Sequence, residues 1–314
     1  LYAVADRRHL LQFLNMAALT PVATRTSTNN ASSATIDPEV YIADNSKQRQ
    51  YNLKVLDLFQ GSFLNGTNRS QQILDLGCGT GDFTREYLLP RCPNVEKMVA
   101  VDISNEMVEY AKEHFAHPRI CYEVLDISGN GVTDFVKRYG LFDRVYSFFC
   151  LSWTKYQEKA FKNIAQLLKP DGGCLLVFGT SSIAARFRKK LATLDHWRKY
   201  REASFMLVNT IPPSVDLVDR DDLLSYILGL VKNASLVPTT CEVLQVTHTW
   251  STVEEVCRPL MSLSCLSTLV TGEEKSLLLK DVAEHAAKLW AEKEAGGSPF
   301  SATVFLVRAH KPRP

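Results

Sequence analysis

QQILDLGCGTGDFTREYL, residues 71–88, places three glycines between an apolar run and a segment with the pattern of a helix. The glycines are Gly77, Gly79 and Gly81. A dinucleotide-binding loop has the spacing G-x-G-x-x-G, and its third glycine falls where this sequence has Asp82. A carboxylate there opposes a pyrophosphate, and Asp75 adds a second negative charge. The loop therefore favours a ligand with a positive group and no phosphate, a description that S-adenosylmethionine fits.

The residues around this loop alternate between patterns typical of strands and of helices. The expected strands are 72–77, 97–104, 120–128, 142–151 and 171–179, and the expected helices between them are 81–91, 105–115, 131–140 and 157–170. Such an alternation predicts an α/β fold with a doubly wound, mainly parallel sheet. Upstream, residues 41–59 have a helical pattern with a polar first half, and Ser104 has the position of an N-cap.

Acidic residues stand at the ends of the first three strands. Asp75, Asp102 and Asp126 should surround one crevice, because open α/β sheets bind ligands at the carboxyl ends of their strands. Asp102 fits the ribose hydroxyls, and Asp126 fits an adenine amino group with Ile127 covering the ring. A single aspartate after a strand is common in solvated turns, but three beside a glycine loop favour a cofactor site.

The regular alternation of strand and helix patterns ends after Gly179. Residues 182–201 and 220–233 have helical patterns, and 241–250 and 302–312 have the pattern of two closing strands. The strands then number seven, and we expect the intervening helices to cover the site as a cap.

The chain divides accordingly into a tail and one domain. Residues 1–38 are rich in Ala, Thr, Ser and Asn, a composition that predicts a disordered tail. Residues 39–314 form the domain, with cap insertions at about 181–235 and 252–295.

Composition excludes several classes of protein. The formal net charge of +2 gives no general reason to expect nucleic acid, and the basic run at 186–201 fits the solvated face of an amphipathic helix. The eight cysteines contain no C-x-x-C pair and, like the histidines, lack metal-ligand spacing, so we expect no metal site. No apolar run reaches the ~18 residues of a membrane span.

Location and assembly are less constrained. We expect a cytoplasmic monomer or homodimer, with a mitochondrial transit peptide as the alternative because the first residues contain Arg and few acids. The chain begins at Leu1, and Met16 is an alternative start.

Two sets of motifs carry a resemblance to known families. "ILDLGCGTGDFT", "VAVDISNEMVEYA" and "VLDI" resemble the motifs of class I S-adenosylmethionine-dependent methyltransferases. "FDRVYSFFCLSWTKYQEKAFKNIAQLLKPDGGCLLVF" and the upstream "YIADNSKQRQ" resemble the arthropod juvenile hormone acid O-methyltransferases. The resemblance is strong over residues 41–180 and weak beyond them.

This resemblance implies a Rossmann-like methyltransferase fold, the cofactor S-adenosyl-L-methionine, and in-line methyl transfer to a lipophilic carboxylic acid such as farnesoic acid or juvenile hormone acid. In that family a Gln and a Trp handle the carboxylate, and the matching positions here are Gln48 and Trp153. A carboxylate is ionised at pH 7 and needs no general base, so these neutral donors serve to orient it. Ser152 departs from the family, which commonly has His before the Trp.

The resemblance also implies further site residues. Those expected at the cofactor are Asp75, Gly77, Cys78, Gly79, Gly81, Asp102, Ile103, Met107, Asp126, Ile127 and Ser147, and those expected at the acceptor are Tyr41, Phe149 and Trp197.

Three alternatives stay open. The first is a methyltransferase with another small-molecule acceptor, for which a Tyr or Lys base in the cleft would argue. The second is a cofactor-binding regulator without catalysis. The third, a nucleic-acid methyltransferase, is disfavoured because "CLSW" stands where an N-P-P-[YF] motif would hold the target amine.

Overall fold

The computed structural model describes residues 36–64, 70–203, 205–247, 250–264, 266–267 and 269–313. Most of the tail expected at 1–38, and the alternative start Met16, therefore lie outside the described residues. The first described element is the helix α2 (Pro38–Asp44), which Asp37 caps by accepting hydrogen bonds from two backbone N–H groups.

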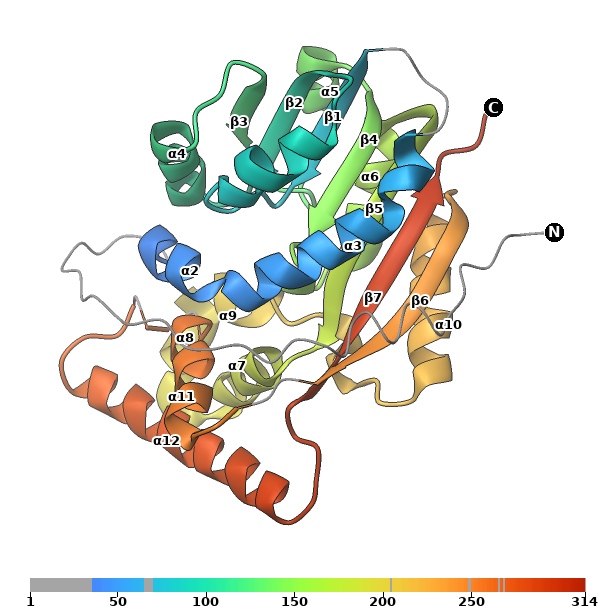
Figure 1. The fold of residues 1–314 in the computed structure, drawn as a ribbon. Helices are drawn as coiled ribbons and strands as arrows, with labels where there is room; N and C mark the ends of the chain where they lie inside the picture. Colours follow the sequence, from blue (N-terminus) through green and yellow to red (C-terminus); the bar gives the residue numbers. More distant parts are fainter. Residues whose placement is uncertain are drawn as a thin grey trace.

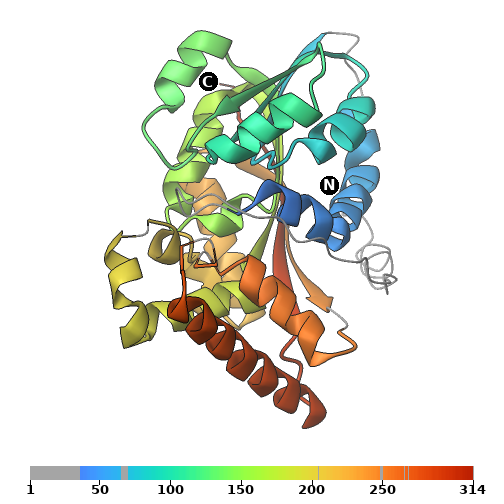
Figure 2. The ribbon, with the colours of Figure 1, turned by 90° about the vertical axis from the view of Figure 1, so that its left-hand side faces the viewer.

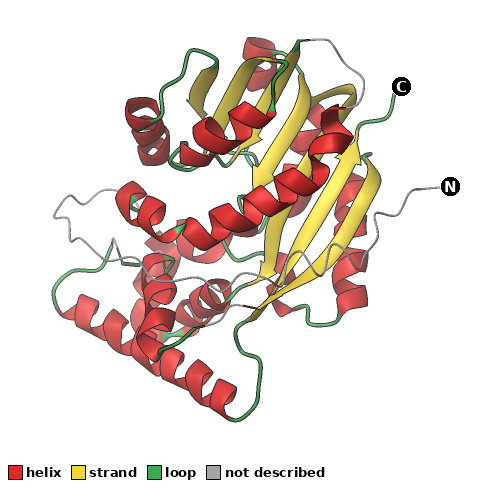
Figure 3. Cartoon of the chain, in the orientation of Figure 1, coloured by secondary structure: helices red, strands yellow, loops and turns green. Residues whose placement is uncertain are grey.

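A seven-stranded sheet forms the centre of the molecule (Figures 1 and 3). Its strands are β1 (Gln71–Leu76), β2 (Val95–Asp102), β3 (Ile120–Val124), β4 (Phe142–Phe148), β5 (Leu168–Ser181), β6 (Val237–Thr247) and β7 (Ser301–His310). Their order across the sheet is β3-β2-β1-β4-β5-β7-β6, and only β7 runs antiparallel to its two neighbours. The expected doubly wound, mainly parallel sheet is confirmed. The order reverses between β1 and β4, and that switch point is where such sheets bind ligands.

Helices cover both faces of the sheet. One face packs against α5 (Val132–Tyr139), α6 (Gln157–Leu167) and α10 (Arg220–Asn233), and the other packs against α3 (Ser46–Leu64). The alternation of side chains along β1 produces this division, because Leu74 and Leu76 face the first group and Ile73 faces the second. Helix α4 (Asn105–His114) covers β2 and β3, and Ser104 caps it as expected, by accepting from Met107 N.

The cap has a hydrophobic core of its own at the carboxyl end of the strands (Figure 2). Its helices are α7 (Ile183–Thr193), α8 (Arg198–Ala203), α9 (Phe205–Asn209), α11 (Val253–Ser262) and α12 (Glu273–Glu294). The range expected for the cap, 181–235, also contains α10, but α10 packs on the sheet beside α6. None of the helices in the described part of the chain combines the length and the apolar character that crossing a membrane requires.

Two expected helices differ from the structure. The helix expected over 41–59 is divided between α2 and α3 at Asn45, whose side chain accepts from Arg49 one turn later. The helix expected over 81–91 is a π-helical turn, Thr84–Leu88, followed by a 3₁₀ turn, Leu89–Arg91. Neither change alters the position of the glycine loop at the end of β1.

Candidate cofactor and acceptor site

The glycine loop needs its glycines for backbone conformation and for packing. Gly77 has φ +80° and Gly79 has φ +54°, both in the left-handed region. A Cβ on Gly77 would lie 2.2 Å from Cys150 Cβ, and one on Gly79 would lie 3.2 Å from the ring of Tyr41. The loop is therefore enclosed by the chain after β4 on one side and by α2 on the other.

A cavity of about 1650 Å³ opens beside this loop, between the sheet and the cap. The predicted residues that line it are Tyr41, Gln48, Gly77, Gly79, Asp102, Ile103, Met107, Asp126, Ile127, Phe149 and Trp153. It brings the ends of β1 to β4 together with α2, α3, α7 and α11, so residues far apart in the sequence share one space.

The cofactor end of the cavity is acidic. Asp102 accepts hydrogen bonds from Gly79 N and Ser104 N, each at 3.0 Å, and burial raises the pKa of Asp102. Asp126 accepts from Ser128 N at 2.8 Å. Among the described residues, no Lys, Arg or His forms an ion pair with either carboxylate. The carboxylate oxygens of Asp102 and Asp126 can therefore accept further hydrogen bonds from a ligand. The hydroxyl and amino groups of a nucleoside are suitable donors.

Apolar side chains lie beside these carboxylates. Ile103, which follows β2, is 50% exposed, and it lines the cavity together with Ile127 and Met107. Exposed apolar surface next to hydrogen-bonding groups is typical of small-molecule sites. The described residues therefore fit a cofactor with an apolar ring and polar edges.

Asp75 was expected at the cofactor, but it lies behind the wall of the cavity. It is 3% exposed and does not line the cavity, and Thr84 Oγ1 donates to its carboxylate at 2.6 Å. Burial, the largest cause, raises the pKa of Asp75 to about 7. Any influence of Asp75 on the cofactor thus acts through the loop or through space.

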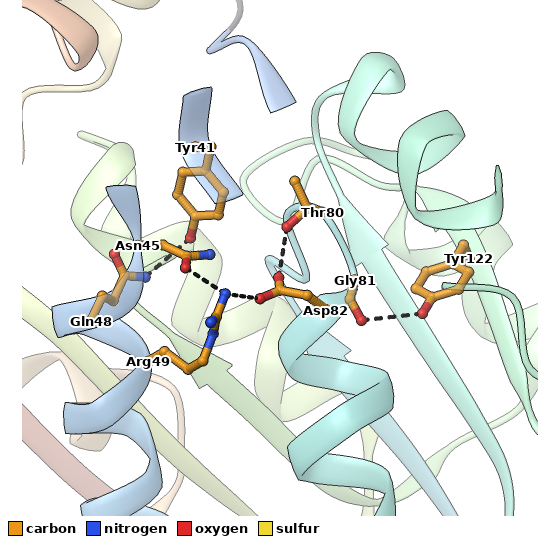
Figure 4. A network of polar contacts seen from close by, with 8 residues as sticks. All are labelled: Tyr41, Asn45, Gln48, Arg49, Thr80, Gly81, Asp82 and Tyr122. Carbon is orange, nitrogen blue, oxygen red and sulfur yellow. Dashed lines mark hydrogen bonds and ion pairs between the residues drawn. The ribbon is translucent and has the colours of Figure 1, made fainter. Parts of the chain in front are cut away.

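Asp82 is neutralised by a partner that the sequence did not reveal. Arg49 Nη2 of α3 lies 2.5 Å from Asp82 Oδ2, and Thr80 Oγ1 donates to the other oxygen at 2.7 Å (Figure 4). The same Arg49 nitrogen donates to Asn45 at 2.7 Å. Asp82 therefore repels a phosphate less than an unpaired carboxylate would, because its charge is paired with Arg49 and this pair connects the loop to α3.

Four other predicted residues lie outside the cavity wall. Gly81 is part of the loop but does not face the cavity, and Cys78 packs in the small core under α4. Ser147 is fully buried and donates to Leu76 O at 2.9 Å. Trp197 is fully buried in the core of the cap, and its Nε1 donates to Asp281 Oδ2 at 2.7 Å. The structure thus gives Trp197 a structural position rather than the acceptor contact that was expected.

The cavity also contains the pair of neutral donors that was predicted for the acceptor, Gln48 and Trp153. Gln48 Nε2 donates to Tyr41 Oη at 3.2 Å, next to the glycine loop (Figure 4). Trp153 ends the 3₁₀ turn that follows β4, and Phe149 at the start of this connection has φ +58°. Ser152, which also lines the cavity, donates to Phe149 O at 3.0 Å.

Sequence reasoning missed two residues of this wall. Arg188 was assigned to a solvated basic face, but it is 3% exposed and its guanidinium lies 4.2 Å from the centre of the Trp153 ring. A signal existed, because position 188 lies one turn from Ala184 and Leu191, which are on the buried face of α7. Tyr51 also lines the cavity, and its buried hydroxyl has no hydrogen-bond partner within the described residues.

Charged side chains of both signs line the cavity away from the strand ends. Lys47, Lys54, Arg188 and Arg258 line it from α3, α7 and α11, together with the carboxylates of Asp44 and Glu255. Within the residues that the structure describes, no group of three or more His, Cys, Asp or Glu is suited to hold a metal ion.

Comparison with known proteins agrees with this geometry. Residues 73–172 match the family model described as a methyltransferase domain. The chain is 34% identical over 165 residues to juvenile hormone acid O-methyltransferase of Drosophila melanogaster, and 35% identical over 163 residues to that of Bombyx mori. Each match covers 52% of this chain and 55% or 56% of the relative, so the chain spans about half the length of the curated relatives it matches.

A solved structure is also similar. It is Haemonchus contortus phosphoethanolamine N-methyltransferase 2 in complex with S-adenosyl-L-methionine, with a TM-score of 0.47 and 20% identity over 84% of this chain and 53% of that one. The family match covers residues 73–172, which contain the glycine loop and the ends of β1 to β4, and it supports a methyltransferase with S-adenosylmethionine as its cofactor.

Proposed function

We propose that the chain is an O-methyltransferase that esterifies a lipophilic carboxylic acid of the farnesoic acid or juvenile hormone acid type. The observation that supports this most directly is the composition of the acceptor wall. Gln48 and Trp153 supply neutral N–H donors, and Arg188 supplies a positive charge, in a cavity that is otherwise lined largely by apolar side chains. An ionised head group and an apolar tail match that combination.

The acceptor wall needs no proton acceptor for this reaction. When bound, S-adenosylmethionine supplies a methyl group, whose bond to sulfur breaks with the electron pair left on sulfur as the carboxylate oxygen forms the new bond. Gln48 and Trp153 orient that oxygen through neutral hydrogen bonds, which leave its lone pairs more reactive than a close ion pair would. The apolar walls exclude water, which disfavours the charged ground state relative to the less charged transition state.

Phenols and amines are the alternative acceptors, because their methylation calls for a base and Lys47 and Lys54 line the cavity with two tyrosines. Tyr41 and Tyr51 both line the cavity, and burial raises the pKa of each phenol far above neutrality. Both hydroxyls therefore keep their protons, so neither tyrosine is the base.

The test is an acceptor panel. The purified chain is incubated with methyl-labelled cofactor and with farnesoic acid, other terpenoid acids, saturated long-chain acids, and phenols and amines of similar size. We expect label in the methyl esters of apolar acids, with terpenoid acids preferred. Cofactor binding without transfer to any acid would refute the proposal.

Two variants test the assigned roles. Gln48→Ala and Trp153→Phe should each lower kcat by up to about 100-fold through misorientation of the acceptor, while the affinity for the cofactor stays near that of the wild type. Matched controls are Gln166→Ala, at an exposed position of α6, and Trp290→Phe, on α12 and not in the cavity wall. A large loss of cofactor affinity in the first two variants would show that these residues belong to the other end of the cavity.

A further inference from the structure

A hydrogen bond between α2 and α3 joins two residues of the cavity wall (Figure 4). Gln48 Nε2 donates to Tyr41 Oη at 3.2 Å, and both side chains line the cavity. A glutamine amide has two N–H donors, so this bond uses one of them and leaves the other for a ligand. Within the described ranges the Gln48 side chain forms no further hydrogen bond, so the orientation of its amide depends on Tyr41.

Tyr41 is in turn held by the glycine loop. A Cβ on Gly79 would lie 3.2 Å from Tyr41 Cε1, so the phenol ring packs directly on the backbone of the loop. The N–H of Gly79 donates to Asp102, the carboxylate expected at the ribose, at 3.0 Å. Gly79 therefore binds an expected cofactor residue through its amide and also packs against the residue that holds Gln48.

The protonation state of Tyr41 suits its contact with the amide. Burial, and to a smaller extent the carboxylates of Asp82 and Asp102, raises the pKa of Tyr41 far above neutrality. The hydroxyl is therefore neutral, and Oη accepts from the amide without forming an ion pair. Tyr41 can hold Gln48 in this way throughout the neutral pH range, in which a carboxylic acid is ionised.

We propose that Tyr41 is a positioning residue, which acts on the acceptor through Gln48 and aligns the amide of Gln48 with the methyl donor. This inference rests on the proposed carboxyl methylation. In-line transfer requires the attacking oxygen, the methyl carbon and the sulfur to be aligned, and a displacement of about 1 Å can cost about 100-fold in rate. One packed ring and one hydrogen bond join the loop beside the cofactor to the donor for the acid. Tyr41 thus places both ligands relative to the same segment of backbone.

Tyr41→Phe tests this role, because it keeps the ring on Gly79 and removes only the oxygen that accepts from Gln48. The amide of Gln48 can then rotate, and the acid loses its fixed orientation. We expect kcat for farnesoic acid to fall by about 10-fold, while KM for S-adenosylmethionine stays within about twofold of wild type. A rise in KM for the cofactor without a fall in kcat would show that Tyr41 serves the cofactor alone, and it would overturn the inference.

The decisive experiment is a double-mutant cycle with Gln48→Ala, in which kcat for farnesoic acid is measured at saturating cofactor. If Tyr41 acts through Gln48, adding Tyr41→Phe to Gln48→Ala should change kcat by less than about twofold. A Tyr41 hydroxyl that touches the acid directly predicts instead that the two losses multiply. A general loss of stability also predicts multiplication, because it does not depend on the side chain at position 48. Multiplication of the two losses would therefore overturn the inference.

Tyr122→Phe is the matched control. Tyr122 packs on the same loop at Gly81 without lining the cavity, and its Oη donates to Phe115 O at 3.0 Å, so this variant also removes the hydrogen bond of a buried phenol. We expect its kcat at saturating cofactor to stay within about twofold of wild type. A fall as large as in Tyr41→Phe would overturn the inference, because any disturbance of the loop would then have the same effect.

The result for Gln48→Ala alone also bears on the inference. If that variant keeps the kcat of wild type, Tyr41 cannot act through the amide, and the inference is overturned while methyl transfer by wild type stands. Failure of the proposed function is recognised separately, as the absence of acid methylation by wild type.

Discussion

A buried carboxyl group at the end of β1 links folding stability to pH. Burial raises the pKa of Asp75 from its ordinary value of 3.8 to about 7, so the folded state holds a proton that the unfolded state releases. Its contribution to stability is complete below about pH 3.8 and is lost as the pH rises through 7. Asp75→Asn keeps an acceptor for Thr84 and cannot ionise. The free energy of unfolding should therefore fall between pH 5 and 8 more steeply in wild type than in the variant.

Urea denaturation at pH 5, 6, 7 and 8 measures this difference. Asp57→Asn is the control, because the Asp57 side chain is 51% exposed and its removal should not change the pH dependence. Parallel curves for wild type and Asp75→Asn would show that Asp75 is ionised throughout this range.

A comparison of Gly77 with Gly140 distinguishes the energetic cost of a left-handed backbone from that of a steric clash. Gly77 has φ +80° and Gly140 has φ +78°, but a Cβ on Gly77 would lie 2.2 Å from Cys150 Cβ, whereas one on Gly140 meets nothing within 4 Å. Gly140→Ala should cost about 1–2 kcal/mol for the left-handed backbone. Gly77→Ala should cost a further 1–3 kcal/mol, roughly the cost of overpacking, and should weaken cofactor binding. Equal losses of stability in the two variants, measured by thermal unfolding, would contradict the packing argument.

At the scale of elements, one ion pair connects α3 to the glycine loop. Arg49 and Asp82 are 24% and 4% exposed, so Arg49→Met leaves a buried carboxylate without its partner. We expect a loss of about 3 kcal/mol, the lower end of the range for a broken buried pair, together with weaker binding of S-adenosylhomocysteine. The control is Arg91→Met. It removes an exposed ion pair between Arg91 and Asp57, which lies on α3 like Arg49, and it should cost about 0–1 kcal/mol.

Calorimetric titration and urea unfolding give both quantities. A loss in Arg49→Met no larger than in Arg91→Met would mean that the loop does not depend on α3 for its order.

The elements that the sequence predicts well are those defined by continuous apolar patterns. β1 to β5 lie where alternating apolar runs and turns predict them, because a parallel strand buried on both faces has a distinctive composition. The break at Asn45 is not predicted, since it depends on a local side-chain contact with Arg49 that periodicity does not encode. Asp102 and Asp126, the carboxylates expected at the cofactor, could be located for the same reason as the strands, because Asp102 ends β2 and Asp126 follows the end of β3.

The cap shows why the acceptor site was less predictable. Periodicity along α7 identifies Phe187 and Leu191 as apolar, but it does not state whether that face meets a ligand or another helix. Trp197, expected at the acceptor, instead packs in the core of the cap. Arg188 shares the buried face of α7 and reaches the cavity because Trp153, distant in sequence, lies beneath its guanidinium. Such contacts depend on the tertiary structure alone.

At the scale of the whole molecule, the sheet and the cap have separate hydrophobic cores, with the cavity between them. The cap core is fastened by Asp281 of α12, which accepts from Trp197 Nε1 at 2.7 Å and lies 2.8 Å from His196 Nε2. Because these two clusters of buried side chains are separate, they should open independently, and the less stable one should open first. The cap is then a unit whose local stability affects acceptor binding without affecting the fold of the cofactor half.

Trp197→Phe tests this division, because it keeps an apolar ring and removes a buried hydrogen bond to a carboxylate, at a cost of about 1.5–3 kcal/mol. Hydrogen exchange should become faster in α11 and α12 and remain unchanged in β1 and β4, and affinity for the acid acceptor should fall while cofactor affinity is retained. The comparison is Phe161→Leu, at a fully buried position of the sheet core, which should speed exchange in the strands. If Trp197→Phe accelerates exchange equally in the cap helices and in the central strands, the two cores unfold as one unit and the acceptor site has no independent stability.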